Sequence, residues 1–156
     1  MIVRQLAQTD RGAVRELLLE SQVFSEEEVR VALEILDSGL SGGLEGDYPL
    51  FAAEADGRVL GYVCIGRTPL TRSSWHLYWL CVHPRAHGRG IGQALNTHVE
   101  RFIRARAGER IVVETSGRPD YDRARRFYER AGYCAVGRIP DYYKPGDDCV
   151  FYCKVL

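Results

Sequence analysis

The segment of this chain most suited to chemistry joins the end of an apolar strand to a glycine-rich turn and then to a helix. Residues 80–95 are Leu-Cys-Val-His-Pro-Arg-Ala-His-Gly-Arg-Gly-Ile-Gly-Gln-Ala-Leu. The first backbone N–H groups of a helix lack partners within the helix, and the helix dipole adds positive potential there. Glycine lets a phosphate approach such a backbone closely. With Arg85 and Arg89 adding charge, the segment predicts an anion-binding site.

Two common phosphate-binding motifs do not match this turn. It lacks the Gly-Lys-Ser/Thr ending of a P-loop, which disfavours nucleotide hydrolysis. A full Gly-x-Gly-x-x-Gly is also missing, because Gln93 stands at the third glycine position. The turn lies mid-chain, whereas a dinucleotide-binding fingerprint belongs to an early βαβ unit. The remaining alternative to an anion site is a plain strand-to-helix turn in which glycines relieve strain.

Two separated motifs resemble the signatures of the GNAT superfamily of N-acetyltransferases. One signature is Gln/Arg-x-x-Gly-x-Gly/Ala after an apolar-Val-x-Pro strand end, and the other is Asn-x-x-Ala-x-x-x-Tyr-x-x-x-Gly-Phe/Tyr. The matching residues here are Val82-His83-Pro84, His87-Gly88-Arg89-Gly90-Ile91-Gly92, and Ala124, Tyr128, Gly132 and Tyr133. His87 replaces the usual Gln or Arg, and Tyr121 replaces the usual Asn. The order of elements agrees with the family over essentially the whole chain.

The resemblance implies transfer of an acetyl group from acetyl-CoA to a primary amine by direct attack, without a metal. A backbone N–H on strand 75–82 is expected to polarise the thioester carbonyl. His87 is expected to be tolerated, because backbone N–H groups of the turn do most of the phosphate binding in the family. The implied coenzyme-binding residues are Leu80, Cys81, Val82, His87, Gly88, Arg89, Gly90, Ile91, Gly92, Gln93, Tyr121 and Tyr128.

Acyl transfer to an amine needs a base for the amine and an acid for the leaving thiolate. Tyr128 matches the acid tyrosine of the family, and its alternative role is core packing. Glu114, which ends an apolar strand, matches a base used in some relatives; its alternative is a carboxylate that faces solvent. His76 and Glu54 are the runners-up for the base, and His76 lies where relatives often carry an acidic residue that faces the acceptor.

The five cysteines invite two other hypotheses. A covalent acyl-cysteine at Cys81 lacks a partner base, and an apolar strand cysteine is more often inert packing. No Cys-x-x-Cys spacing occurs, so a zinc site is not expected. Buried free thiols are the simpler interpretation of Cys64, Cys81, Cys134, Cys149 and Cys153.

The acceptor is expected near the last hairpin, which carries Tyr142 and Tyr143 beside carboxylates. Aromatic rings next to carboxylates suit an ammonium group, although the same residues also make an ordinary turn. A small amine, an amino acid and a protein or peptide α-amine all remain open as acceptors. Residues 37–47 are glycine-rich and predict a mobile loop. One or two arginines of 118–130 are candidates for the 3′-phosphate of the coenzyme, and the rest predict a solvated face.

The length and composition of the chain limit the number of domains and the classes of partner that are expected. The 156 residues predict one domain over 1–156, with 46% apolar and 27% charged residues. With 21 basic and 21 acidic side chains the chain is neutral, which argues against nucleic acid as partner. Neither a signal peptide nor an 18-residue apolar stretch is present, so a cytoplasmic protein away from the membrane is expected. A homodimer is possible.

The hydrophobic pattern predicts a mixed α/β fold in the order β-α-α-β-β-β-α-β-α-β-β. A GNAT-like central mixed sheet of about seven strands, flanked by four helices, is expected. The predicted strands are 2–6, 50–54, 59–65, 75–82, 111–115, 133–139 and 149–155. The predicted helices begin after an N-cap at Thr9-Asp10, extend from a capping box at Ser25 to about residue 39, and cover 90–107 and 120–131.

Two functions from other classes compete with catalysis. A non-catalytic acyl-CoA-binding sensor on the same fold would bind the thioester without transferring the acyl group. A plain interaction domain would have a turn that binds no ligand at all.

Overall fold

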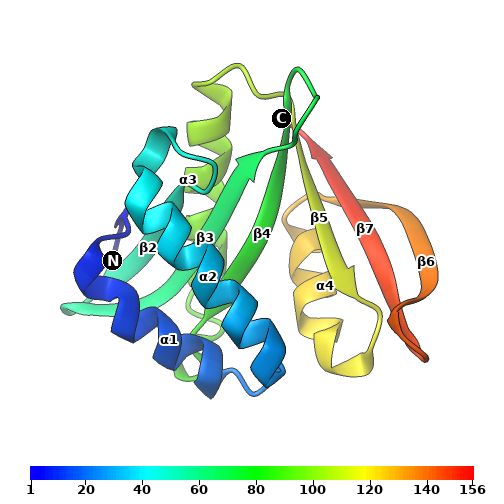
Figure 1. Ribbon diagram of the computed structural model, residues 1–156, viewed down its shortest axis with the longest axis horizontal. Coiled ribbons are helices and arrows are strands. Elements are labelled where there is room, and N and C mark those ends of the chain that lie inside the picture. Colours follow the sequence, from blue (N-terminus) through cyan, green and yellow to red (C-terminus); the bar gives the residue numbers. More distant parts are fainter. The chain divides into compact units, whose positions relative to one another are not determined.

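Seven strands hydrogen-bond in the order β1-β2-β3-β4-β5-β7-β6, and four α-helices connect them (Figure 1). The computed structural model describes residues 1–156. Along the chain the elements follow the predicted order, with short 3₁₀ helices between some of them. The mixed α/β fold is therefore confirmed. None of the helices combines the length and the apolar character that a membrane crossing requires.

The bounds agree closely with the predicted elements. The largest difference in a strand is at β6, which continues beyond its predicted end at residue 139. The strands are β1 (Ile2–Gln5), β2 (Leu50–Ala55), β3 (Arg58–Arg67), β4 (Ser74–Val82), β5 (Arg110–Ser116), β6 (Cys134–Lys144) and β7 (Asp147–Val155). The helices are α1 (Arg11–Glu20), α2 (Glu26–Gly42), α3 (Ile91–Arg104) and α4 (Asp122–Arg130).

The chain divides into two compact units. Unit 1 comprises Met1–Gly66 and Tyr78–Phe102, and unit 2 comprises Arg67–Leu77 and Ile103–Leu156. Strand β4 contributes to both, and within unit 2 its residues Ser74–Leu77 pair in parallel with Arg110–Val113 of β5. A single domain over 1–156 stays a prediction.

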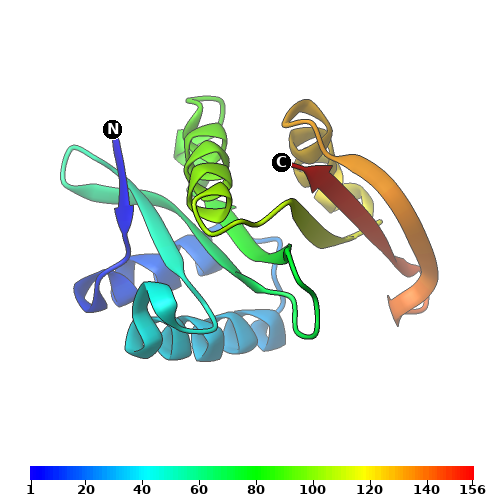
Figure 2. The same ribbon diagram turned by 90° about the horizontal axis from the view of Figure 1, so that it is seen from above.

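In unit 1, helices lie on both faces of the strands. Figure 2 shows α1 and α2 on one side of β2–β4 and α3 on the other. Leu17 of α1 and Leu36 of α2 share one buried cluster with Tyr62 of β3. On the opposite face the ring of Phe51 contacts the ring of Phe102, with 5.0 Å between centroids. Both faces are therefore apolar, as continuous hydrophobic strands predict.

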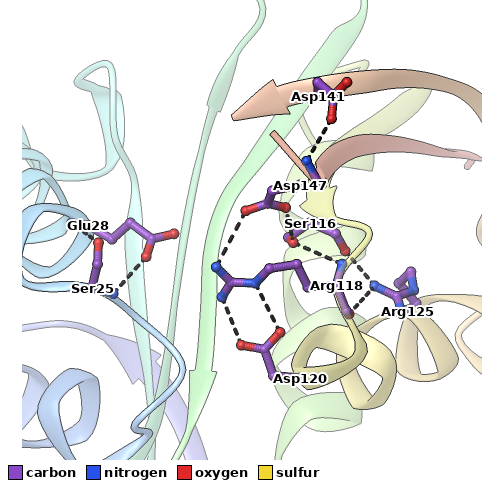
Figure 3. Close-up of polar contacts among 9 residues, drawn as sticks. Ser25, Glu28, Ser116, Arg118, Asp120, Arg125, Asp141 and Asp147 are labelled. Atoms are coloured by element: carbon purple, nitrogen blue, oxygen red, sulfur yellow. Dashed lines mark hydrogen bonds and ion pairs between the residues drawn. The ribbon is translucent and has the colours of Figure 1, made fainter. Parts of the chain in front are cut away.

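The prediction of a mobile loop over residues 37–47 is wrong, because α2 continues to Gly42 and a 3₁₀ helix covers Gly43–Glu45. The capping box at Ser25 is confirmed, with Ser25 N–H donating to Glu28 at 2.7 Å and Glu28 N–H donating to Ser25 Oγ at 3.2 Å (Figure 3). Gly39 does not end the helix. A Cβ there would collide with the carbonyl oxygen of Tyr48 and lie 2.7 Å from Leu50 Cδ1. This glycine permits close packing rather than a bend.

The predicted position of the N-cap of α1 is confirmed at Asp10, but a side-chain cap is not formed. Asp10 occupies the N-cap position, but its side chain makes no hydrogen bond to the helix. Its Oδ2 accepts instead from the backbone N–H of Ala7 at 2.8 Å and from Arg4 at 2.7 Å. Because Arg4 binds this carboxylate, the pKa of Asp10 lies below its usual value. The carboxylate of Asp10 is therefore engaged by Arg4, six residues earlier, and by the start of the preceding 3₁₀ helix rather than by α1.

In unit 2, β5 lies between β4 and β7, and α4 packs against the β5–β7–β6 strands (Figure 1). Strand β5 pairs with β7 in antiparallel register from Arg110 to Ser116. Its parallel pairing with β4 ends earlier, at Val113. The buried ring of Tyr128 from α4 meets the ring of Tyr152 from β7 at 5.8 Å between centroids. Strand β6 is exposed along its whole length.

The packing of Gly39 makes a stability prediction. Gly39→Ala should lower the free energy of unfolding by about 2 kcal/mol, because the new methyl overpacks the contact with Tyr48 and Leu50. Gly42→Ala is the matched control in the same helix, since a Cβ there meets nothing within 4 Å. It should change stability by no more than about 1 kcal/mol, in the favourable direction. Urea unfolding of both variants measures the difference, and equal stabilities would contradict the packing role.

Candidate active site

The turn between β4 and α3 has the backbone conformation that an anion site needs. A 3₁₀ helix covers Pro84–Ala86, and α3 begins at Ile91. Gly88 and Gly90 have φ of +78° and +77°, a region that side chains with a Cβ rarely adopt. Nothing lies within 4 Å of a Cβ built on either residue, so glycine is required by backbone conformation rather than by space. The first N–H groups of α3 follow directly and have no partner within the helix.

His87 fastens the head of this turn to the end of β4. Its Nε2 lies 2.9 Å from the carbonyl oxygen of Val82. A carbonyl only accepts, so the proton is on Nε2 of the imidazole. The side chain that departs from the family pattern therefore has a local structural role. Its part in coenzyme binding stays a prediction.

His83 also holds this turn in place by side-chain contacts, and the sequence pattern did not indicate that role. Its Nδ1 accepts from the backbone N–H of Arg85 at 3.1 Å and so caps the 3₁₀ helix. Its Nε2 lies 2.9 Å from a carboxylate oxygen of Glu20, at the end of α1. The only available signal was a His-Pro pair at a strand end, because the partner Glu20 is distant in sequence.

In unit 2 the structure brings two of the predicted site residues together. His76 Nε2 lies 3.6 Å from Glu114 Oε1, with side chains 16% and 36% exposed. His76 is paired with Val112 in the parallel register, and Glu114 lies two residues further on the same strand face. Burial lowers the pKa of His76, and the charge of Glu114 only partly offsets this. The imidazole is therefore neutral near pH 7.

Tyr143 and Cys149 extend this group. The hydroxyl of Tyr143 donates to Cys149 Sγ at 3.5 Å, and Cys149 is fully buried. Burial is the main cause that raises the pKa of Tyr143, and the nearby Glu114 contributes to it. Burial likewise raises the pKa of the Cys149 thiol. Tyr142 contacts Tyr143 edge-on at 5.0 Å between centroids, and both tyrosines are about half exposed. Sequence reasoning treated Cys149 as core and missed its contact with Tyr143.

Tyr128 lies in a group of aromatic rings. Its centroid is 5.5 Å from that of Tyr133 and 5.8 Å from that of Tyr152. Burial raises the pKa of its phenol, so the hydroxyl stays protonated at neutral pH. Tyr121, just before α4, has the guanidinium of Arg118 over its ring at 5.4 Å. The catalytic role of Tyr128 and the coenzyme contact of Tyr121 stay predictions.

The loop between β5 and α4 is held by a polar network (Figure 3). The buried Ser116 hydroxyl donates to the buried Asp147, and Arg118 lies 3.5 Å from the same carboxylate. Arg118 also binds Asp120 at 2.8 Å. Arg125 donates to the Ser116 carbonyl at 2.5 Å and to the Arg118 carbonyl at 2.9 Å. Both arginines are thus engaged in holding the loop.

Comparisons with known proteins agree with this fold. Residues 12–133 match the model of the acetyltransferase (GNAT) family. The chain belongs to the GNAT family. It is 32% identical, over 160 residues, to an uncharacterized N-acetyltransferase of Methanocaldococcus jannaschii, covering 99% of this chain and 91% of the relative.

Solved structures of GNAT proteins also match. A Desulfovibrio desulfuricans protein described as a GNAT acetyltransferase is 35% identical, with a TM-score of 0.93 over 99% of this chain and 98% of the other. An aminoglycoside 6′-N-acetyltransferase in complex with coenzyme A shares the fold at 17% identity, with a TM-score of 0.76 over 99% and 97%. This chain is accordingly an N-acetyltransferase of the acyltransferase class.

Two candidates do not join the site of this GNAT enzyme. Glu54 lies 2.6 Å from Arg4 in an ion pair, which leaves its role as base without support from the geometry. Cys81 is buried, and burial raises the pKa of its thiol to about 12. Its Sγ contacts the Leu17 carbonyl at 3.7 Å. A thiol so far from ionisation argues against a covalent acyl-cysteine. All five cysteines are free, and no three His, Cys, Asp or Glu side chains are grouped to hold a metal ion.

The cap by His83 predicts an effect on coenzyme binding. His83→Ala should lower the free energy of unfolding by about 1 kcal/mol, as loss of a cap does. The dissociation constant of coenzyme A should rise roughly fivefold, because the turn loses one of its fastenings. His83→Asn restores an N-cap oxygen and should recover most of the affinity. Calorimetric titration checks this, and unchanged affinity in the Ala variant would remove His83 from the turn's support.

His76 predicts a pH dependence of stability. Its folded-state pKa lies below the ordinary value of 6.5, so protonation favours the unfolded chain. Stability due to the neutral imidazole is therefore present above pH 6.5 and is lost as pH falls through the folded-state pKa. His76→Gln should lose less stability than the wild type between neutral pH and about pH 5. Urea unfolding at both pH values measures this, and identical losses would contradict it.

Proposed function

We propose that this GNAT enzyme transfers the acetyl group of acetyl-CoA to a primary amine by direct attack. The observation that carries the proposal is the turn before α3, with left-handed Gly88 and Gly90, in a chain whose family is established. Such a turn presents backbone N–H groups to a pyrophosphate. The coenzyme A complex of a protein with the same fold supports this choice of donor.

In this proposal unit 1 binds the donor. The backbone N–H groups of residues 88–93 bind the pyrophosphate, and Arg85 and Arg89 add positive charge beside them. A backbone N–H within Leu80–Val82 polarises the thioester carbonyl and stabilises the oxyanion of the tetrahedral intermediate. A backbone donor fits this task because it needs no reorganisation during the reaction.

Unit 2 supplies the acid–base groups. Glu114, with neutral His76 3.6 Å away, accepts a proton from the ammonium form of the acceptor. The free amine nitrogen then forms a bond to the carbonyl carbon, and the bond from that carbon to sulfur breaks. The departing sulfur takes a proton from Tyr128, whose buried phenol is held in the protonated state. The nitrogen loses its second proton as the amide forms, and that proton restores the phenol of Tyr128. Proton and electron pairs thus balance without another reactant.

The acceptor in this proposal is a primary ammonium on a small molecule or on a protein or peptide. Tyr142 and Tyr143 offer half-exposed aromatic rings, and Glu114 offers a carboxylate in the same unit. Aromatic faces and a carboxylate together favour a cation over a neutral amine.

The experiment that tests the function is release of free thiol from acetyl-CoA in the presence of a panel of amines. The panel holds aminoglycosides, free amino acids and peptides with a free α-amine. Transfer to at least one member supports the proposal. Binding of acetyl-CoA, seen as thermal stabilisation, without transfer to any member would support the sensor function instead. No stabilisation at all would favour an interaction domain.

Tyr128→Phe tests the acid. The variant should lower kcat by about 100-fold while the dissociation constant of acetyl-CoA stays within about threefold, since only proton donation is lost. Tyr133→Phe is the matched control, because it removes a hydroxyl from the same group of rings. Steady-state kinetics with a good acceptor measure both. Equal activities of the two variants would rule out Tyr128 as the acid.

A further inference from the structure

Unit 1 contains a hollow beside the coenzyme turn, and its lining includes Arg85 and Arg89, which the proposed function places near the pyrophosphate. Its volume is about 630 Å³, within the range of small-molecule sites. Three segments line it: the beginning of α1 with the residues before it, the β2–β3 turn, and residues 83–89. Leu17 and Ala86 are buried and give it an apolar floor.

Three arginines meet at this hollow without an ion-pair partner. Arg58 comes from the β2–β3 hairpin, and Arg85 and Arg89 come from the coenzyme turn. Elsewhere in unit 1, Arg4, Arg11 and Arg30 each bind a carboxylate within 2.8 Å. Three guanidinium groups around one hollow repel one another unless an anion lies between them.

The acidic and basic neighbours do not remove this excess of positive charge. Asp10 also lines the hollow, but its carboxylate is bound by Arg4. His83 lines it as well, and its ring lies 2.9 Å from Glu20. Glu16, exposed on α1, is the one carboxylate of the lining that has no ion-pair partner. One carboxylate against three guanidinium groups leaves a net positive site.

We propose that Arg58, Arg85 and Arg89 form a binding site for a phosphate monoester. A dianion balances most of the charge, and its oxygens match the forked donors of arginine. The phosphate has two possible sources, the 3′-phosphate of the coenzyme or a separate phosphate monoester. The first source rests on the proposed function, since it requires the coenzyme to bind at the turn. Two of the candidates from the arginine-rich segment, Arg118 and Arg125, already hold the loop before α4.

The test compares Arg58→Gln with Arg15→Gln, a matched exposed arginine on α1 that does not line the hollow. Coenzyme A and 3′-dephospho-coenzyme A are titrated into the wild type and both variants by calorimetry. If the coenzyme supplies the phosphate, the wild type and Arg15→Gln should prefer coenzyme A by about tenfold, and Arg58→Gln should lose that preference. Arg58→Lys, which keeps the charge but not the fork, should retain part of it.

A second measurement identifies a separate phosphate. Inorganic phosphate is added to each protein saturated with 3′-dephospho-coenzyme A, and the melting temperature is followed. Phosphate should then stabilise the wild type and Arg15→Gln but not Arg58→Gln, and the wild type should not prefer either coenzyme. This combined result assigns the site to a separate phosphate monoester. If Arg58→Gln and Arg15→Gln behave alike in both measurements, the proposal is overturned. Neither measurement requires turnover, so failure of the acetyl transfer would be seen separately.

Discussion

The structure of the proposed donor site depends on one constraint, the left-handed backbone at Gly88 and Gly90. Backbone N–H groups cannot be aimed by a change of rotamer, so their direction is set only by the path of the chain. Hydrogen bonds hold that path of the chain at several points. The backbone N–H of His83 donates to Leu60 of β3 at 2.8 Å, His83 Nδ1 caps the 3₁₀ helix, and His87 holds the carbonyl of Val82. The two imidazoles therefore support backbone geometry, and the groups proposed to bind phosphate are main-chain atoms.

In unit 2, the register of the strand pairs sets the positions of the proposed acid–base residues. Parallel pairing sets His76 opposite Val112, and the two-residue period of a strand brings Glu114 to the same face. Antiparallel pairing of β5 with β7 sets Ser116 opposite Cys149 and Glu114 opposite Phe151. A slip of one residue in either ladder would turn Glu114 to the other face. The proposed acid–base group thus depends on the register of two strand pairs. The Ser116–Asp147–Arg118 network holds the end of β5 at the following loop.

Local patterns in the sequence predicted most of the fold, and the failures have a common cause. The capping box at Ser25 depends on neighbours a few residues away, and it is present. Gly39 and Asp10 were misjudged because their environments come from residues distant in sequence or from an ion pair. A glycine that ends a helix and one that admits a neighbouring carbonyl look alike in a sequence. The residues of the proposed donor turn could be predicted because they are contiguous, whereas the contacts of His83 with Glu20 and of Tyr143 with Cys149 join separate elements.

Arginine use shows why charge counts alone say little about ligands. The chain is neutral overall, so composition argues against a polyanionic partner. Yet Arg4, Arg118 and Arg125 are engaged in ion pairs or backbone hydrogen bonds that hold the fold, and they offer no charge to a ligand. Among the arginines without an ion-pair partner, Arg58, Arg85 and Arg89 line one hollow beside the coenzyme turn. A small anionic ligand responds to the local field within a few ångströms, since salt screens the rest. A neutral protein can therefore present a strongly cationic site, provided that its structural arginines are neutralised elsewhere.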